Sequence, residues 1–203
     1  MKKLIFSAAT LLAVAASASA QDVKLGLKAG VNLATYSGED VNNQKYNTGA
    51  HAGVAFNFGF SDLLSFQPEL LYSMKGAEYE PAGQNIKYKE TLHYIDVPLL
   101  LKINADGPFF ELGPQVGFLA AVNRESTVTS GGVSSTLKDK NKDDFNTVDV
   151  GYVAGLGWQF ESGPSIGLRY NGSLVPVRKA ANGDRSKGFN STFMLSLGYF
   201  FGE

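Results

Sequence analysis

One stretch, Leu64–Gly76, constrains the fold more than any other part of this 203-residue chain. Along it, apolar residues such as Phe66 and Leu70 alternate with polar ones such as Gln67 and Glu69. Alternate side chains of a strand point to opposite sides of its sheet, so this segment has one oily face and one polar face. It is also long enough to cross a bilayer, for which a tilted strand needs roughly 9–11 residues.

The same alternation recurs along the chain and predicts eight strands. They cover residues 23–34, 49–60, 64–76, 92–103, 108–122, 147–160, 164–175 and 190–201. The segments between them are alternately long and short, and the long ones are polar loops at 35–48, 77–91, 123–146 and 176–189. Outer-membrane barrels have an even number of strands, short turns on the periplasmic side and long loops outside. The sequence therefore predicts an all-β fold, an eight-stranded antiparallel transmembrane β-barrel in up-and-down order, with both termini in the periplasm.

Composition agrees with a barrel wall. The chain has 23 Gly, 14 Phe and 9 Tyr, and only 18% of its residues are charged, against about 25% in ordinary domains. Glycines gather on the polar faces, where they leave room for long side chains inside a narrow barrel. A soluble barrel with a ligand cavity is the alternative, but it would place these glycines on a solvated face, where they weaken strands. The net charge of −1 provides no basic surface for nucleic acid.

The first residues predict a cleaved signal peptide over residues 1–20. Two lysines precede an Ala-rich apolar run that ends in Ala18-Ser19-Ala20, which is typical of a secretory signal. A membrane anchor is the alternative interpretation. The remaining residues, 21–203, suit one barrel domain. The chain has no cysteine, which excludes a disulfide framework and a lipoprotein anchor.

The parity of the strands also predicts the interior. It places nine charged side chains in the lumen: Lys24, Lys28, Glu69, Lys75, Asp96, Lys102, Glu111, Asp149 and Arg169. Buried charges are tolerated only when they are paired and hydrogen-bonded, so we expect a network with Gln67, Gln115 and Asn171. The alternative is an ion path or a proton relay. A plug is favoured because side chains about fill the lumen of an eight-stranded barrel.

Three prolines lie within the predicted strands, at Pro68, Pro98 and Pro114. A proline cannot donate a hydrogen bond to the strand beside it, so we expect a β-bulge at each of these positions.

Residues that could support catalysis are few. His93 faces lipid, with Ile95 where a lipid A deacylase would carry serine. His51 points inward near Asp149 and Ser73, which matches an acyltransferase only in composition, and a hydrogen-bonded interior histidine is the favoured interpretation. No cluster has zinc-ligand spacing, and no glycine run matches a phosphate loop. We therefore expect no enzymatic activity, no metal and no cofactor.

The last long loop is basic. Arg178, Lys179, Arg185 and Lys187 oppose Asp184, and guanidinium and ammonium groups bind phosphate well. The cluster is therefore a candidate contact for lipopolysaccharide, and a solvated loop tip is the alternative.

The chain resembles the PorT-like outer-membrane β-barrel family of Bacteroidota. The resemblance rests on Gly26–Asn32, Phe66–Ser73, Tyr94–Leu101, Gly113-Pro114 and the closing segment Phe193–Phe201. It implies an eight-stranded barrel in the outer membrane. The roles of the family are mostly unassigned, although some members are implicated in protein secretion.

Together these features predict a monomeric integral outer-membrane barrel with a plugged polar interior. Its role would be structural or one of interaction through extracellular loops, in contact with membrane lipid, lipopolysaccharide and a protein of the envelope. A lipid A-modifying enzyme and a small-solute pore are the alternative functions.

Overall fold

The computed structural model describes residues 23–38, 44–179 and 188–201. They form nine antiparallel strands: β1 (Val23–Ser37), β2 (Gln44–Gly59), β3 (Leu64–Tyr79), β4 (Ile86–Asn104), β5 (Pro108–Ser130), β6 (Val133–Asp139), β7 (Val148–Gln159), β8 (Pro164–Pro176) and β9 (Phe189–Phe201). The predicted signal peptide, residues 1–20, lies outside the described residues. Within the described part of the chain, no helix is long and apolar enough to cross a membrane.

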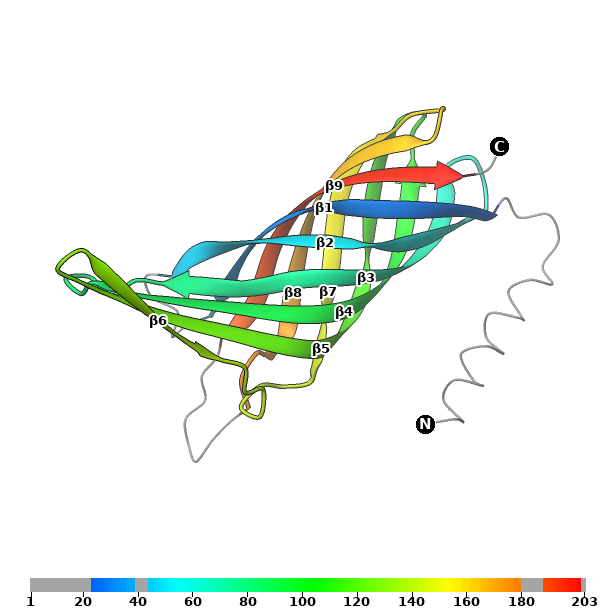
Figure 1. The fold of residues 1–203 in the computed structure, drawn as a ribbon. Helices are drawn as coiled ribbons and strands as arrows, with labels where there is room; N and C mark the ends of the chain where they lie inside the picture. The colour runs from blue at the N-terminus through cyan, green and yellow to red at the C-terminus, as the bar shows by residue number, and fades with distance from the viewer. Residues whose placement is uncertain (1–22, 39–43, 180–187, 202–203) are drawn as a thin grey trace.

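Eight of these strands close into a ring, which confirms the predicted barrel. The ring runs β1-β2-β3-β4-β5-β7-β8-β9, and β9 pairs again with β1. Figure 1 shows the ring in ribbon form. The ninth strand, β6, pairs only with β5, so it lies outside the ring.

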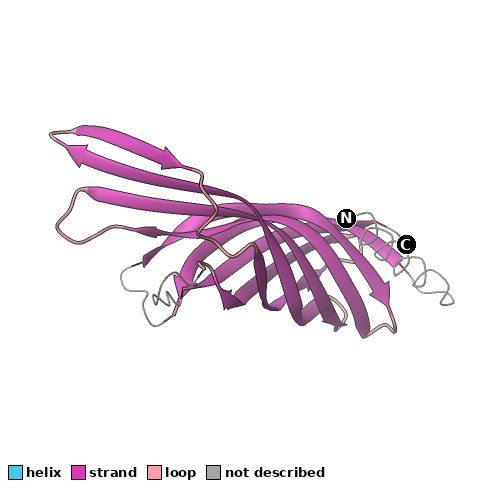
Figure 2. Cartoon of the chain, turned by 90° about the horizontal axis from the view of Figure 1, so that it is seen from below, coloured by secondary structure: helices cyan, strands magenta, loops and turns pink. Residues whose placement is uncertain are grey.

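The two ends of the barrel differ. Residues 60–63, 105–107 and 160–163 make short turns at one end, called the turn end here, where β1 begins and β9 finishes (Figure 1). At the other end, called the hairpin end, the β3–β4 and β5–β6 hairpins project well beyond the ring (Figure 2). The alternation of short and long connections is thus present in the structure.

The predicted loops at 77–91 and 123–146 are wrong for much of their length, because strands occupy them. Cross-strand ion pairs hold these polar extensions together. Glu78 lies opposite Lys89 with their charged atoms 3.4 Å apart, and Glu125 lies opposite Lys138 at 2.8 Å. The β5–β6 tip is a two-residue turn in which both glycines have positive φ, 58° and 82°, as a type I′ hairpin turn requires.

The two faces of the ring separate as predicted. Leu70 and Leu168 on the outer face are each 50% exposed, whereas their neighbours Glu69 and Arg169 are buried inside. Large apolar and aromatic side chains cover the outside of every strand of the ring. Such an exterior is stable in a bilayer rather than in water.

The prediction of bulges at the three mid-strand prolines is wrong. Register is unchanged on both sides of Pro68, Pro98 and Pro114. The register shifts fall elsewhere, between Tyr46 and His51, at His93/Tyr94, and between Gly172 and Pro176. Each proline therefore forgoes one ladder hydrogen bond, which the continuous pairing on either side tolerates.

Candidate functional site

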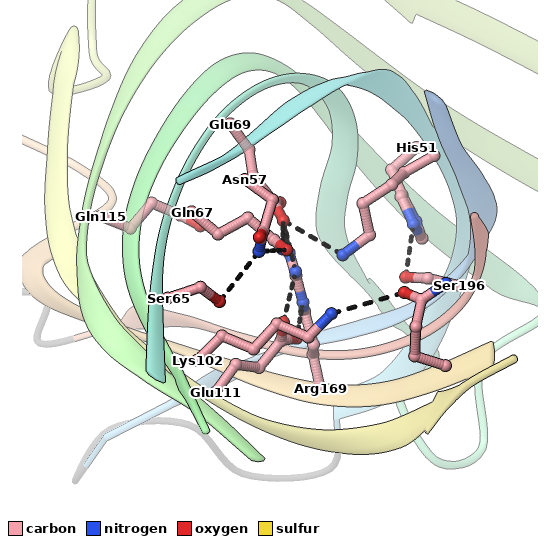
Figure 3. A network of polar contacts seen from close by, with 12 residues as sticks. His51, Asn57, Ser65, Gln67, Glu69, Lys102, Glu111, Gln115, Arg169 and Ser196 are labelled. Carbon is pink, nitrogen blue, oxygen red and sulfur yellow. Dashed lines mark hydrogen bonds and ion pairs between the residues drawn. The ribbon is translucent and has the colours of Figure 1, made fainter. Parts of the chain in front are cut away.

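The centre of the lumen is crossed by one arginine. Arg169 of β8 donates two hydrogen bonds to Glu69 of β3, from Nη1 to Oε2 at 2.6 Å and from Nη2 to Oε1 at 2.7 Å. The same guanidinium also holds Glu111 of β5, with Nη2 3.0 Å from Oε2 and Nε bound to Oε1. Figure 3 shows the three side chains meeting inside the ring. Bidentate pairs of this kind are the strongest charge-assisted hydrogen bonds in proteins.

These contacts span the full width of the barrel. In the eight-stranded ring, β8 and β3 are four strands apart in either direction, so Arg169 joins opposite walls. Lys28 of β1 adds a third wall through its ammonium, 3.1 Å from Glu69, and Gln67 donates to the same carboxylate at 2.7 Å. All these side chains are buried. The network therefore crosses the lumen at this level, and its charges are paired with one another.

A second polar layer lies nearer the hairpin end. Lys75 of β3 is 2.9 Å from Asp96 of β4 and 3.7 Å from Asp149 of β7. Asn190 of β9 donates to Asp149 at 3.1 Å and to the Tyr94 hydroxyl at 3.4 Å. Since β4 and β9 are also opposite strands of the ring, this layer crosses the lumen as well.

On the hairpin side of this layer lies a cluster of buried apolar side chains that was not predicted from the sequence. This apolar cap consists of Leu92, Tyr94, Leu119, Val122, Phe145 and Val177, with Tyr36 packed against it. Two loop segments bring in its last members: Asn146 N–H donates to the Val177 carbonyl at 3.0 Å, and Phe145 bridges to Arg178. The cap makes the hairpin-end mouth a small hydrophobic core.

A cleft of about 500 Å³ lies on the hairpin side of the cap, between the two projecting hairpins. Its floor is Glu90, which accepts hydrogen bonds from the Tyr36 hydroxyl and from Arg178 Nη2, the latter at 2.6 Å. One wall carries Tyr79 and Tyr88, whose rings stack with centroids 6.3 Å apart. An aromatic wall beside fixed polar groups is the usual composition of a ligand site.

The opposite wall of the cleft comes from the β5–β6 hairpin. Arg124 lies 2.6 Å from Asp139, and Leu137 and Lys138 extend the wall toward the tip. A hydrogen bond from the Lys138 ammonium lowers the pKa of the Glu125 carboxyl below its ordinary value. Both walls are therefore held by ion pairs along the hairpins.

The predicted lipopolysaccharide residues do not all lie free at the surface. Arg178 is engaged by Glu90 and stacks over the Phe145 ring, 4.9 Å from its centroid. Lys179 donates to the Asp143 carbonyl at 2.8 Å. Arg185 and Lys187 lie outside the described residues.

The two histidines are both held by neutral partners. His51 Nδ1 is 2.7 Å from Asn32 Oδ1, and its Nε2 is 2.8 Å from the Ser196 hydroxyl, so neither nitrogen bonds Asp149 or Ser73. His93, predicted to face lipid, is only 8% exposed, because the Tyr72 hydroxyl at 2.6 Å and Asn123 at 2.8 Å cover its ring. Across the described residues, no cluster of histidine and carboxylate groups could hold a metal ion.

Two predicted interior lysines lie outside these layers, at the turn end. Lys24 is only partly buried, whereas Lys102 is 3% exposed with its ammonium 4.1 Å from the Phe109 ring centroid. Phe109 was not predicted as a neighbour of Lys102. Its parity, shared with Glu111, would have placed it in the lumen.

The family model described as "Outer membrane protein beta-barrel domain" matches residues 17–201. No curated protein sequence matches the chain.

Several solved structures are similar to it at low identity. One is Ail, the attachment invasion locus protein of Yersinia pestis, in complex with the heparin analogue sucrose octasulfate: it is 15% identical, with a TM-score of 0.44 over 89% of this chain and 99% of that chain. Neisserial surface protein A is 12% identical, with a TM-score of 0.42 over 88% and 97%. OprG from Pseudomonas aeruginosa is 11% identical, with a TM-score of 0.40 over 90% and 98%.

Proposed function

We propose that this chain, which belongs to the outer membrane protein beta-barrel domain family, is a non-conducting barrel that displays a binding surface outside the cell. The family match locates it in the outer membrane. The short turns lie at the same end of the barrel as the start of β1 and the end of β9. Outer-membrane barrels keep their short turns in the periplasm. We therefore infer that the termini are periplasmic and that the β3–β4 and β5–β6 hairpins are extracellular.

The observation that carries the proposal is that side chains cross the lumen at three successive levels between the Arg169 layer and the hairpin end. Arg169 joins opposite walls through Glu69, Lys75 and its partners cross the next layer, and the apolar cap closes the hairpin end. A pore needs a continuous aqueous path, whereas ion pairs and packed apolar groups in a narrow barrel provide rigidity. The small-solute pore is therefore the weaker alternative.

The display role is supported by the hairpins beyond the ring. They add ordered, ion-paired strands that the barrel does not need for closure, and they enclose the cleft lined by Tyr79 and Tyr88. The carboxylates and cations of the cleft are paired with each other. Such a cleft therefore suits binding of a partner rather than catalysis. The finer resemblance to PorT-like proteins, with its link to secretion, is part of this proposal.

Planar-bilayer recording tests the plug directly. The purified barrel should give no stable conductance steps. A variant with Glu69, Glu111 and Arg169 all changed to Ser should also stay closed, because the Lys75 layer and the apolar cap still cross the lumen. Uniform channels from the unmodified protein would refute the plug. Lipid A mass profiles that change when the protein is produced would favour the enzymatic alternative.

Replacement of the hairpin tip tests the display role. A variant in which residues 125–138 are replaced by a two-residue turn loses Leu137 and Lys138 from the cleft wall and keeps the Arg124–Asp139 ion pair. It should fold and insert normally, since β6 pairs only with the part of β5 that projects beyond the ring. It should lose binding of any surface partner that unmodified cells acquire. Retention of that binding would move the site away from the cleft.

A further inference from the structure

Another hollow lies at the turn end, on the far side of the Arg169 layer from the cleft. This vestibule has a volume of about 350 Å³, within the range of roughly 300–1,000 Å³ usual for small-molecule sites. Its lining includes Lys24, Asn57, Lys102, Asn104, Gln159 and Phe200. The extracellular binding proposed above makes no use of it.

Lys102 is the distinctive group of the vestibule. Its side chain is buried, yet among the described residues no carboxylate lies within ion-pair distance of its ammonium. Its hydrogen-bond partner within the described chain is Gln159 Oε1, at 3.5 Å, and the rings of Phe109 and Phe200 lie 4.1 and 5.2 Å away. Figure 3 shows Lys102 beside the Arg169 contacts rather than within them.

The nearest carboxylate in register is already engaged. Glu111 faces Lys102 across the β4–β5 ladder, but both of its oxygens bind Arg169. In this half of the lumen Lys28, Lys102 and Arg169 carry three positive charges, and Glu69 and Glu111 carry two negative ones. This half of the described interior therefore has one uncompensated positive charge, which borders the vestibule.

We propose that the vestibule binds a small oxyanion, a carboxylate or phosphate group, on the Lys102 ammonium. The aromatic rings stabilise the cation from the lumen side and leave its open side toward the cavity. The amides of Asn57, Asn104 and Gln159 line the same space. A charge-assisted hydrogen bond to a partly desolvated ammonium is stronger than one in water.

The rim of the vestibule restricts which anions enter. Asp62, Asp106 and Glu161 lie in the turns around it and are exposed. Three carboxylates at the entrance repel polyanions while a buried lysine attracts a single oxyanion. The ligand is therefore a group of low charge, presented from the compartment that the turn end faces.

Backbone-amide NMR titrations of the refolded barrel in detergent micelles test the proposal. Inorganic phosphate and sodium acetate are added separately, with sodium chloride at equal ionic strength as the baseline. Saturable shifts should appear at Lys102, Asn104 and Phe109 and be absent at Leu137. The anion that saturates at lower concentration identifies phosphate or carboxylate chemistry, and no saturable shift with either anion overturns the proposal without any variant.

Variants then locate the site. Lys102→Met keeps the apolar stem against Phe109 and Phe200 and should weaken binding by about tenfold or more. Lys24→Met is the matched control at the same mouth and should weaken it less, since Lys24 is only partly buried. An equal or larger loss in Lys24→Met would place the anion at the rim and overturn the assignment. If binding appears only after deletion of residues 202–203, the partner of Lys102 in the full chain is a carboxylate of that segment, and the proposal is also overturned.

Discussion

Removing Glu69 tests the central ion-paired layer most sharply. Its carboxylate accepts two hydrogen bonds from Arg169 and forms an ion pair with Lys28. Glu69→Ala leaves these two cations with Glu111 alone. Loss of one partner of a buried pair costs about 3–5 kcal/mol, so we expect the free energy of unfolding to fall by about that amount, less where lumenal water enters.

The adjacent residue provides a matched control. Leu70 lies at the same depth on β3 but points outward and is half-exposed, so in a bilayer lipid fills the space that Leu70→Ala leaves. We expect a loss of roughly 1 kcal/mol or less, below the range for buried leucines because no closed cavity forms. The protein contains a single tryptophan, Trp158, which lies on the outer face. Its fluorescence during urea unfolding in detergent micelles measures both variants.

A double variant separates charge from packing. Lys28 has Glu69 as its ion-pair partner among the described residues, so Glu69→Ala with Lys28→Met removes one charge of each sign. The double variant should recover part of the stability that Glu69→Ala alone loses, with a coupling energy within about 0.5–3 kcal/mol. The reasoning is refuted if Leu70→Ala is the more damaging change, or if the double variant shows strictly additive losses.

Three further predictions follow from the described contacts. Gly155→Ala would place a Cβ 2.8 Å from Glu111 Oε1 and 2.9 Å from Arg169 Cγ, so it should destabilise the barrel by about 1–3 kcal/mol. At Gly167 an added Cβ would have no atom nearer than 3.4 Å, so Gly167→Ala should lower the free energy of unfolding by less in the same urea assay. Cysteines at Leu70 and Leu168 should react only with lipid-soluble maleimides, while one at Lys138 reacts with water-soluble reagent on intact cells; water-phase labelling of all three would contradict the orientation. Lys138→Ala breaks an exposed ion pair with Glu125, so it should destabilise only the β5–β6 hairpin, by about 0.2–1 kcal/mol. Amide exchange should be faster in this hairpin, and the unfolding midpoint of the barrel should not change. A lowered midpoint would show that the hairpin folds as part of the barrel.

Within the ring, the strands and their faces could be predicted because two different surroundings act on alternate residues. Outward positions such as Leu70 and Leu168 meet lipid, and inward positions such as Glu69 and Arg169 meet other polar groups. This difference in surroundings produces an alternation of apolar and polar residues with a period of two. Any stretch that crosses the bilayer carries it, whatever its exact partners.

Beyond the ring, alternate residues no longer meet lipid on one side and polar groups on the other, and the prediction of strands failed there. Both faces of the projecting hairpins are wet or polar, so residues 77–79 and 123–130 show no alternation and were predicted as loops. The remaining signal was the complementarity of Glu78 with Lys89 and of Glu125 with Lys138. That signal is readable only once the register is known, because opposite charges are equally common in solvated loops.

The apolar cap could not be predicted for a different reason. Leu92 shares the inward parity of Tyr94, which would place it in the lumen, but its partners Phe145 and Val177 come from irregular segments with no periodicity. Their inward position depends on backbone contacts between the two segments, such as that of Asn146 with Val177. Long-range contacts between irregular segments leave no local pattern in one sequence.

The charges of the lumen are balanced in total and separated along the barrel axis. Lys28, Lys75, Lys102 and Arg169 oppose Glu69, Asp96, Glu111 and Asp149. Lys75, however, faces two carboxylates at the hairpin side, and the turn side has the excess cation. Lys102 pairs in register with Glu111 and Asp149 with Gly117, a separation along β5 of about 20 Å at 3.3 Å per residue.

At that separation the two excess charges attract each other by only about 1 kcal/mol, even at an effective dielectric constant of about 20. That is too little to offset the cost of burying an unpaired ammonium, which amounts to several kcal/mol for an ion. Lys102 must therefore obtain its compensation locally, from the rings beside it and from what enters the vestibule. An interior built only to plug the barrel would place Asp149 at the level of Lys102, and the observed separation is the reason to look for a ligand at the turn end.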